Sequence, residues 1–218
     1  MRTFCILRAC ASLILTWLFP PGLALEFPGP GPGTAQAHLT DDHLSLGNQV
    51  LSCAWTTADG KLKPVEVADR IGKRTIDLQG TETFRLTLAD GRSLAASELK
   101  VIGKPALETL LPKPGASILA HRFPGRQVVV HLEAADGNLA VEWRAILRDG
   151  ANAVRQEIAF KAKEKAIPVK ETRLMELPAV GAAVVGSVPG SPVVIGNLFF
   201  AYEHPDSQSA IAERATCS

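Results

Sequence analysis

Aromatic residues, cysteine and excess charge are all scarce in this 218-residue chain. Aromatic residues make up 6%, there are 4 cysteines, and 23 Lys+Arg against 22 Asp+Glu give a formal net charge of +1. The balanced charge predicts no nucleic-acid partner, because such proteins carry a clustered basic surface. The remaining composition, with 46% hydrophobic and 21% charged residues, is that of a globular domain. It excludes a disordered or collagen-like chain.

The usual catalytic and metal-binding signatures are also missing. The sequence contains no glycine-rich phosphate loop, no HExxH, no GxSxG and no EF-hand loop. The 5 histidines lack i, i+4 spacing, and no CxxC pair is present. Glycoside hydrolysis requires two carboxylates at a set separation in a cleft, and no motif in the sequence identifies such a pair of acidic residues. The sequence therefore leaves enzymatic activity uncertain and predicts no catalytic residue, no metal site and no cofactor.

Residues 1–24 have the organisation of a secretory signal peptide. Arg2 and Arg8 bracket a short basic region, and the apolar run that follows over residues 9–19 ends before Pro20. The run is shorter than the about 20 residues of a membrane-spanning helix, although an N-terminal anchor helix is the alternative. Small residues allow cleavage after Ala24 or as late as Ala37. We therefore predict a secreted or periplasmic protein with no membrane segment after cleavage.

Residues 25–38 are rich in proline and glycine and predict an extended spacer. The folded domain is expected over residues 39–218. After signal-peptide removal this domain retains only Cys53 and Cys217, which could form a disulfide in an oxidising compartment. The sequence leaves this pairing open, because it does not show whether the two Cα atoms come within reach.

Alternation of apolar and polar residues with a period of two dominates the domain. It is clearest over residues 139–148 and 154–161, with an Asp-Gly turn dipeptide between them. Such alternation places one face of a strand in the core and the other near solvent. The spacing of turns predicts roughly ten to twelve strands in an all-β, two-sheet antiparallel β-sandwich. Trp143 is expected in its core, on the same strand face as Leu139, Val141 and Leu147.

Few segments depart from the strand pattern. Helical periodicity is nearly absent, and we expect short helices only within residues 105–111 and 206–214. His121 and His131 are each expected in a strand, as packed or surface residues and not as metal ligands.

The densest cluster of aromatic and polar residues lies between Gly190 and Pro205. There, an aromatic ring beside hydrogen-bonding groups suits a sugar, whose C–H face stacks while its hydroxyls form hydrogen bonds. A turn at Pro205 would bring together side chains that an extended strand keeps on opposite sides. The candidate carbohydrate-binding residues are Asn197, Tyr202, Glu203 and His204. In the structural alternative, Phe199 and Phe200 are core residues, while Glu203 and His204 secure the strand end or help to dock another domain.

Several segments also resemble a known family in their order along the chain. They are Trp-Arg-Ala-Ile-Leu-Arg-Asp-Gly at 143–150, Val-Arg-Gln-Glu at 154–157, Ile-Pro-Val at 167–169, Val-Val-Gly-Ser-Val at 184–188, and the whole of 190–205. They resemble the N-terminal β-sandwich region of large secreted bacterial proteins related to the α-galactosidase (melibiase) clan, some of which are labelled "enterotoxin". The resemblance covers roughly residues 50–218 and is clearest over 139–205.

The resemblance implies a galactose-mutarotase-like sandwich, or supersandwich, that precedes a catalytic (β/α)₈ barrel holding two aspartates. No residue of this sequence corresponds to those aspartates. We therefore expect an accessory sandwich of a secreted, α-galactosidase-like glycoside hydrolase, truncated and inactive alone, with the catalytic barrel and a glycan as partners. The alternatives are a stand-alone secreted carbohydrate-binding module and a structural or adhesion-type sandwich without a sugar site.

Overall fold

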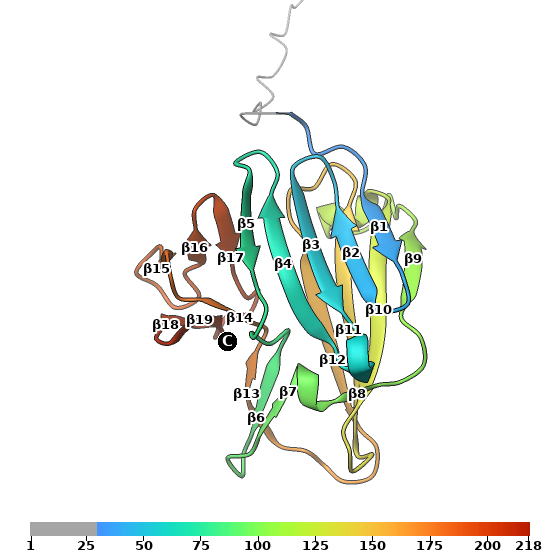
Figure 1. The fold of residues 1–218 in the computed structure, drawn as a ribbon, viewed down its shortest axis with the longest axis vertical. Helices are drawn as coiled ribbons and strands as arrows, with labels where there is room; N and C mark the ends of the chain where they lie inside the picture. The colour runs from blue at the N-terminus through green and yellow to red at the C-terminus, as the bar shows by residue number, and fades with distance from the viewer. Residues whose placement is uncertain (1–29) are drawn as a thin grey trace, which may run out of the picture.

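The computed structural model describes residues 30–218, so the predicted signal peptide lies outside the described residues. These residues form an all-β fold in which two five-stranded antiparallel sheets face each other, beside a C-terminal group of shorter strands (Figure 1). The prediction of an all-β sandwich is confirmed.

The first five-stranded sheet is a meander in which each strand pairs with the next along the chain. Leu44 and Leu46 have no exposed surface and alternate with more accessible neighbours, so period two directs their side chains inward. The strands are β1 (Gln36–Leu39), β2 (His43–Gly47), β3 (Leu51–Thr56), β4 (Lys63–Asp69) and β5 (Arg74–Asp77), with the 3-10 turn η1 (Ala58–Gly60) between β3 and β4.

The second five-stranded sheet has the order β12-β11-β10, with two short strands on the far side of β10. Its long central hairpin connects to β12 through the predicted Asp149-Gly150 turn, where Gly150 has a φ of +74° that favours glycine. The strands are β8 (Lys100–Val101), β9 (Ala106–Leu110), β10 (Gly125–Glu133), β11 (Leu139–Arg148) and β12 (Arg155–Ala162), with the 3-10 turn η3 (Leu119–Arg122) before β10.

Three small antiparallel sheets complete the fold. One lies at one end of the sandwich and contains β6 (Arg85–Leu88), β7 (Ser93–Ala95) and β13 (Val169–Arg173) (Figure 1). The 3-10 turn η2 (Ala96–Glu98) follows β7 along the chain. The other two form what we call the C-terminal lobe, residues 175–218. Its strands are β14 (Met175–Pro178), β15 (Ala182–Val184), β16 (Val193–Ile195), β17 (Leu198–Phe200), β18 (Ser209–Ile211) and β19 (Arg214–Cys217).

The core lies between the two large sheets. Trp55 of β3 and Trp143 of β11 meet edge to face, with ring centroids 5.0 Å apart and an interplanar angle of 67°. Trp143 has no exposed surface, and its Nε1–H donates to Gln156 Oε1 at 3.0 Å. The predicted inward strand face is confirmed, since the other residues on it are also buried: Leu139, Val141 and Leu147.

The start of the domain differs from the prediction. β1 begins at Gln36, inside the expected spacer, and cleavage after Ala37 would cut this strand. Residues just before it also join the fold: Gly150 N–H donates to Gly33 O at 2.8 Å, and Ala35 N–H donates to Asp149 Oδ1 at 2.8 Å. Hydrogen bonds to the turn after β11 therefore hold residues 33–35 against the domain. The proline- and glycine-rich composition of this segment does not reveal such tertiary contacts.

Both expected helices are wrong. Residues 106–110 form β9, because pairing with β10 over five residues satisfies backbone groups that one short helix would leave unpaired. Residues 206–214 contain a turn and β18, and Gln208 and Ser218 exchange backbone hydrogen bonds beside the β18–β19 pair. His121 lies in η3, not in a strand, whereas His131 lies in β10 as expected. The short strands of the C-terminal lobe raise the number of described strands to 19, above the expected range.

Replacing Trp143 tests how far the core depends on this ring. Trp143→Ala should lower the free energy of unfolding by about 3–5 kcal/mol, because it leaves a large cavity between the sheets. Arg144→Ala, on the outward face of the same strand, should cost less than about 1 kcal/mol. Denaturant unfolding followed by circular dichroism measures both, and a cost for Trp143→Ala no greater than that for Arg144→Ala would contradict the role of Trp143.

Candidate functional site

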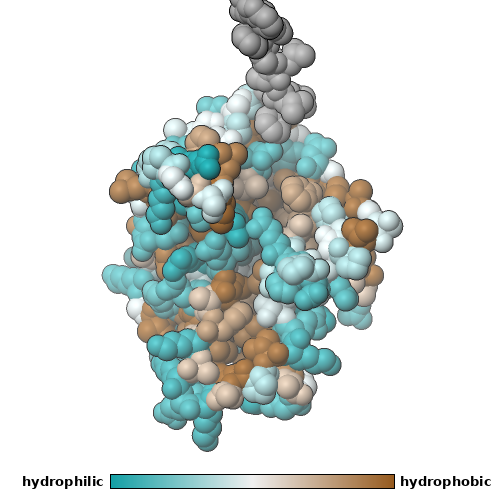
Figure 2. Space-filling view, turned by 180° about the vertical axis from the view of Figure 1, so that it is seen from behind, coloured by the Kyte–Doolittle hydropathy of each residue, from teal (hydrophilic) through white to brown (hydrophobic). Residues whose placement is uncertain are grey.

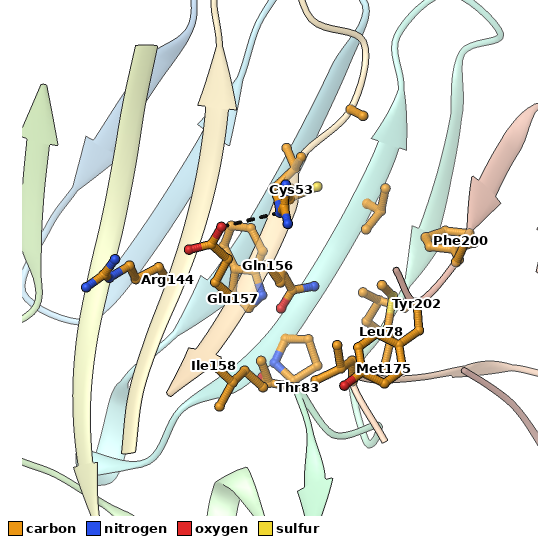
Figure 3. A pocket seen from close by; sticks show the side chains of 18 of the residues that line it. Cys53, Leu78, Thr83, Arg144, Gln156, Glu157, Ile158, Met175, Phe200 and Tyr202 are labelled. Carbon is orange, nitrogen blue, oxygen red and sulfur yellow. Dashed lines mark ion pairs between the residues drawn. The ribbon is translucent and has the colours of Figure 1, made fainter. Parts of the chain in front are cut away.

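A groove with a volume of about 760 Å³ separates β12 from the C-terminal lobe. Its floor is apolar and comes from the first sheet. In the close view, Gln156, Glu157 and Ile158 of β12 lie across the cavity from Met175, Phe200 and Tyr202 (Figure 3). The floor residues include Leu51, Cys53, Trp55, Val67 and Leu78.

The groove exists because the first sheet extends further to one side than the second sheet. Among the described residues, β12 is the last strand of the second sheet and pairs only with β11. The first sheet continues through β4 and β5, and the C-terminal lobe lies beyond β5 (Figure 1). A strip of the inner face of the first sheet is therefore left between β12 and the lobe. Seen from behind, hydrophobic surface is visible between hydrophilic stretches on this side of the molecule (Figure 2).

Three of the four predicted site residues line this groove, namely Asn197, Tyr202 and Glu203, but His204 does not. Gly196 and Asn197 form the two-residue turn of the β16–β17 hairpin, with a φ of +63° at Gly196. The Asn197 side chain is already engaged, since its Nδ2 donates to Asp69 Oδ2 at 3.2 Å. Asn197 therefore joins the C-terminal lobe to the end of β4.

Asp69 and Gly72 anchor this junction. The backbone N–H of Gly72 donates to Asp69 Oδ1 at 2.8 Å and holds the pKa of that carboxyl below its usual value. A Cβ atom at Gly72 would lie 2.2 Å from Asp69 Oδ2 and 2.9 Å from Asn197 Nδ2. A larger residue at this position would therefore have to displace the Asp69 carboxylate or the Asn197 amide from their hydrogen bond.

Tyr202 and His204 lie on the same side of the chain and stack on each other. Their ring centroids are 5.8 Å apart with an interplanar angle of 29°. The expected turn after them is present, because Ser207 N–H donates to His204 O at 3.1 Å. Asp206 N–H donates to His204 Nδ1 at 3.2 Å, which fixes the imidazole ring. His204 thus supports Tyr202 and the strand exit.

Glu203 reaches across the groove to β12. Its Oε2 lies 3.1 Å from Arg155 Nη2, and Arg155 Nε lies 3.3 Å from Glu157 Oε1. The Glu203 side chain is 73% exposed, so the pair is open to solvent. Sequence reasoning missed Arg155 and Glu157 as site residues, because their outward strand positions look like ordinary surface charge.

The two cysteines of the domain are buried, free thiols in the structure. Burial raises the pKa of the Cys53 thiol to about 12. Burial also raises the pKa of Cys217, whose Sγ lies 3.6 Å from Phe200 O and 3.7 Å from Ser209 Oγ. Neither thiol has the lowered pKa of a catalytic or metal-binding cysteine.

Residues 30–218 bring together no group of three or more His, Cys, Asp or Glu side chains suited to hold a metal ion. The same residues contain no helix with the length and hydropathy that a bilayer span requires. Comparison with protein-family models, curated proteins and solved structures finds no match.

Thiol labelling tests the burial of the cysteines. We expect native Cys53 to resist a thiol reagent at pH 8, because a thiol with a pKa near 12 is almost entirely protonated there and is shielded from solvent. Asp90→Cys, in an exposed turn, should label readily under the same conditions. Peptide mass spectrometry distinguishes the cysteines, and rapid labelling of native Cys53 would contradict the burial of its thiol.

Proposed function

We propose that this domain is a non-catalytic accessory β-sandwich of a secreted, α-galactosidase-like hydrolase, and that it contacts glycan at the rim of the groove. The hydrolase context is supported by the sequence resemblance. The glycan contact is supported by one observation, the stacked Tyr202–His204 pair beside the exposed Arg155–Glu203 ion pair.

The composition of this rim suits a sugar. Tyr202 is half-buried against the core, so part of its ring remains accessible beside the groove. Glu203 accepts hydrogen bonds and Arg155 donates them, which matches the mixed donors and acceptors of sugar hydroxyls. The contact is small, and binding must offset the ordering of exposed side chains, so we expect weak affinity.

The acidic residues of the groove favour a non-catalytic role. A glycosidase needs one carboxyl group available to protonate the leaving oxygen. Here Glu142 pairs with Arg144, and Glu157 and Glu203 share Arg155. Glu176 pairs with Arg85 at 2.9 Å. Four of the six glutamates that line the groove are thus paired with arginines, Glu82 accepts two hydrogen bonds from Ser97, and Glu66 forms no ion pair among the described residues.

Exposed apolar side chains in the C-terminal lobe support an accessory role over a stand-alone one. Val180 is 89% exposed, Val188 68% and Phe199 65%. A catalytic barrel packed against this lobe would cover them.

Glycan binding by the purified protein tests the proposed contact. Titration with a panel of α-galactosides should show weak binding, which Tyr202→Ala reduces about tenfold, corresponding to about 1.4 kcal/mol. Phe123→Ala removes an exposed aromatic ring outside the groove and should leave affinity unchanged. Equal binding by folded Tyr202→Ala would place the sugar elsewhere, and no binding to any tested glycan would favour the structural or adhesion-type alternative.

A separate assay tests the absence of catalysis. The purified chain should not release the phenol from an aryl α-galactoside above background, because four of the six groove glutamates are paired with arginines and a fifth, Glu82, is bonded to Ser97. Turnover that a single Asp or Glu substitution abolishes would contradict the proposed non-catalytic role.

A further inference from the structure

The edge of β12 that faces the groove is unpaired. Antiparallel strands alternate between residue pairs that exchange backbone hydrogen bonds and pairs that do not. Lys163 N–H donates to Asn138 O at 2.8 Å, and the β11–β12 register continues without a shift from this point. The odd-numbered residues of β12 therefore form backbone hydrogen bonds with β11.

The β10–β11 pair is consistent with this pattern. Ala134 N–H donates to Leu139 O at 2.9 Å, so the odd-numbered residues of β11 form their backbone hydrogen bonds with β10. The even-numbered residues of β11 are then the ones that bond to β12.

The even-numbered residues of β12 consequently direct their backbone N–H and C=O groups away from β11, along the groove. These residues are Gln156, Ile158 and Phe160, and none of them has a further backbone bond among the described residues. A row of such groups is the usual template for an added strand.

The side chains of the same three residues belong to the inner face. Gln156 accepts from Trp143, while Ile158 packs against the core. Phe160 meets Phe84 edge to face, with centroids 6.1 Å apart, yet it is 36% exposed. The inner face of the sandwich is thus incomplete beside β12, and an additional strand would cover it with every second side chain.

On the outward face of β12, the charge of Lys161 distinguishes this position from its neighbours. Lys163 pairs with Glu133, whereas Lys161 forms no ion pair among the described residues. A neighbouring strand with an acidic residue beside Lys161 would supply a favourable cross-strand pair. The Arg155–Glu203 ion pair crosses the groove, so an added strand pairs with the part of β12 beyond Arg155.

We propose that β12 accepts an extended polypeptide segment of a partner protein as an added strand. Its apolar residues, at alternate positions, face the groove floor, and an acidic residue lies beside Lys161. A glycan lacks the regular N–H and C=O groups, repeating about every 6.6–7 Å along one strand edge, that would match β12. The proposed strand-binding site therefore differs from the proposed sugar contact at the rim. The strand-binding proposal does not depend on the sugar-binding proposal.

Amide hydrogen exchange of the free protein gives the first test. Exchange at Glu157, Ala159 and Lys161 should be slower than at Ile158 and Phe160, because only the odd-numbered amides bond to β11. Equal protection of both sets in a monomer would show that the edge is not open. If protection of the even-numbered amides instead rises with protein concentration, the occupant is a second copy and the proposed peptide partner is wrong.

A peptide of the stated pattern gives the second test. The probe is a capped eight-residue peptide that alternates valine and threonine and carries one glutamate. We expect binding at about 100 µM or tighter, with exchange at Ile158 and Phe160 slowed at least about tenfold at saturation. Lys161→Glu should weaken binding of this probe and leave the fold intact, whereas Lys170→Glu, an exposed charge reversal on β13 outside the groove, should not.

A control on the peptide side separates strand addition from general hydrophobic capture. N-methylation of alternate peptide nitrogens on the edge that meets β12 should abolish binding, while methylation on the opposite edge should be tolerated. Absence of binding at 1 mM, or equal binding by both methylated peptides, would overturn the proposal. Neither outcome affects the glycan titration, which depends on Tyr202 and not on the β12 backbone.

Discussion

The contact between Trp55 and Trp143 is the interaction on which the rest of the structure depends. One indole comes from each large sheet, and their edge-to-face arrangement at 5.0 Å contributes about 0.5–1.5 kcal/mol beyond the burial of the rings. Full burial of Trp143 also requires a partner for its N–H, which Gln156 supplies. The central aromatic contact therefore fixes β12, the last strand of its sheet, through a side-chain bond as well as through the ladder to β11.

The groove is a direct consequence of this arrangement. Trp55 is 3% exposed and contributes both to the joint between the sheets and to the groove floor. The floor is consequently apolar, while the charged side chains of Arg155 and Glu203 lie at the rim. A ligand with hydroxyl groups is suited to the rim, and one with alternating apolar side chains is suited to the floor. The two proposals thus use chemically different parts of one opening.

Local patterns in the sequence were enough to predict β11, β12 and the inward face of Trp143, because period-two alternation and an Asp-Gly turn are both encoded within a few residues. They failed for β9, which pairs with β10 across an intervening loop, and for residues 206–214, where β18 pairs with β19 and β19 in turn pairs with the distant β14. The candidate site shows the same division. Tyr202 and His204 are close in sequence, so a local pattern predicts them together, whereas Arg155 reaches Glu203 only through the tertiary fold.

Polar contacts determine where the C-terminal lobe lies and hence the width of the groove. Asn197 bonds to Asp69, Arg214 Nη2 donates to Gly80 O at 2.9 Å, and Arg85 pairs with the buried carboxylate of Glu176 at 2.9 Å. Each contact is directional, and loss of Arg85 would leave the buried Glu176 carboxylate without its ion-pair partner, so together they fix an orientation that apolar packing alone would leave less defined. Gly72 belongs to the same junction, because a Cβ atom there would press against the Asp69 carboxylate and the Asn197 amide. The wall that carries Tyr202 and Glu203 is therefore positioned by side chains outside the groove's apolar floor, and binding at the rim depends on those tethers as much as on the residues that would touch a ligand.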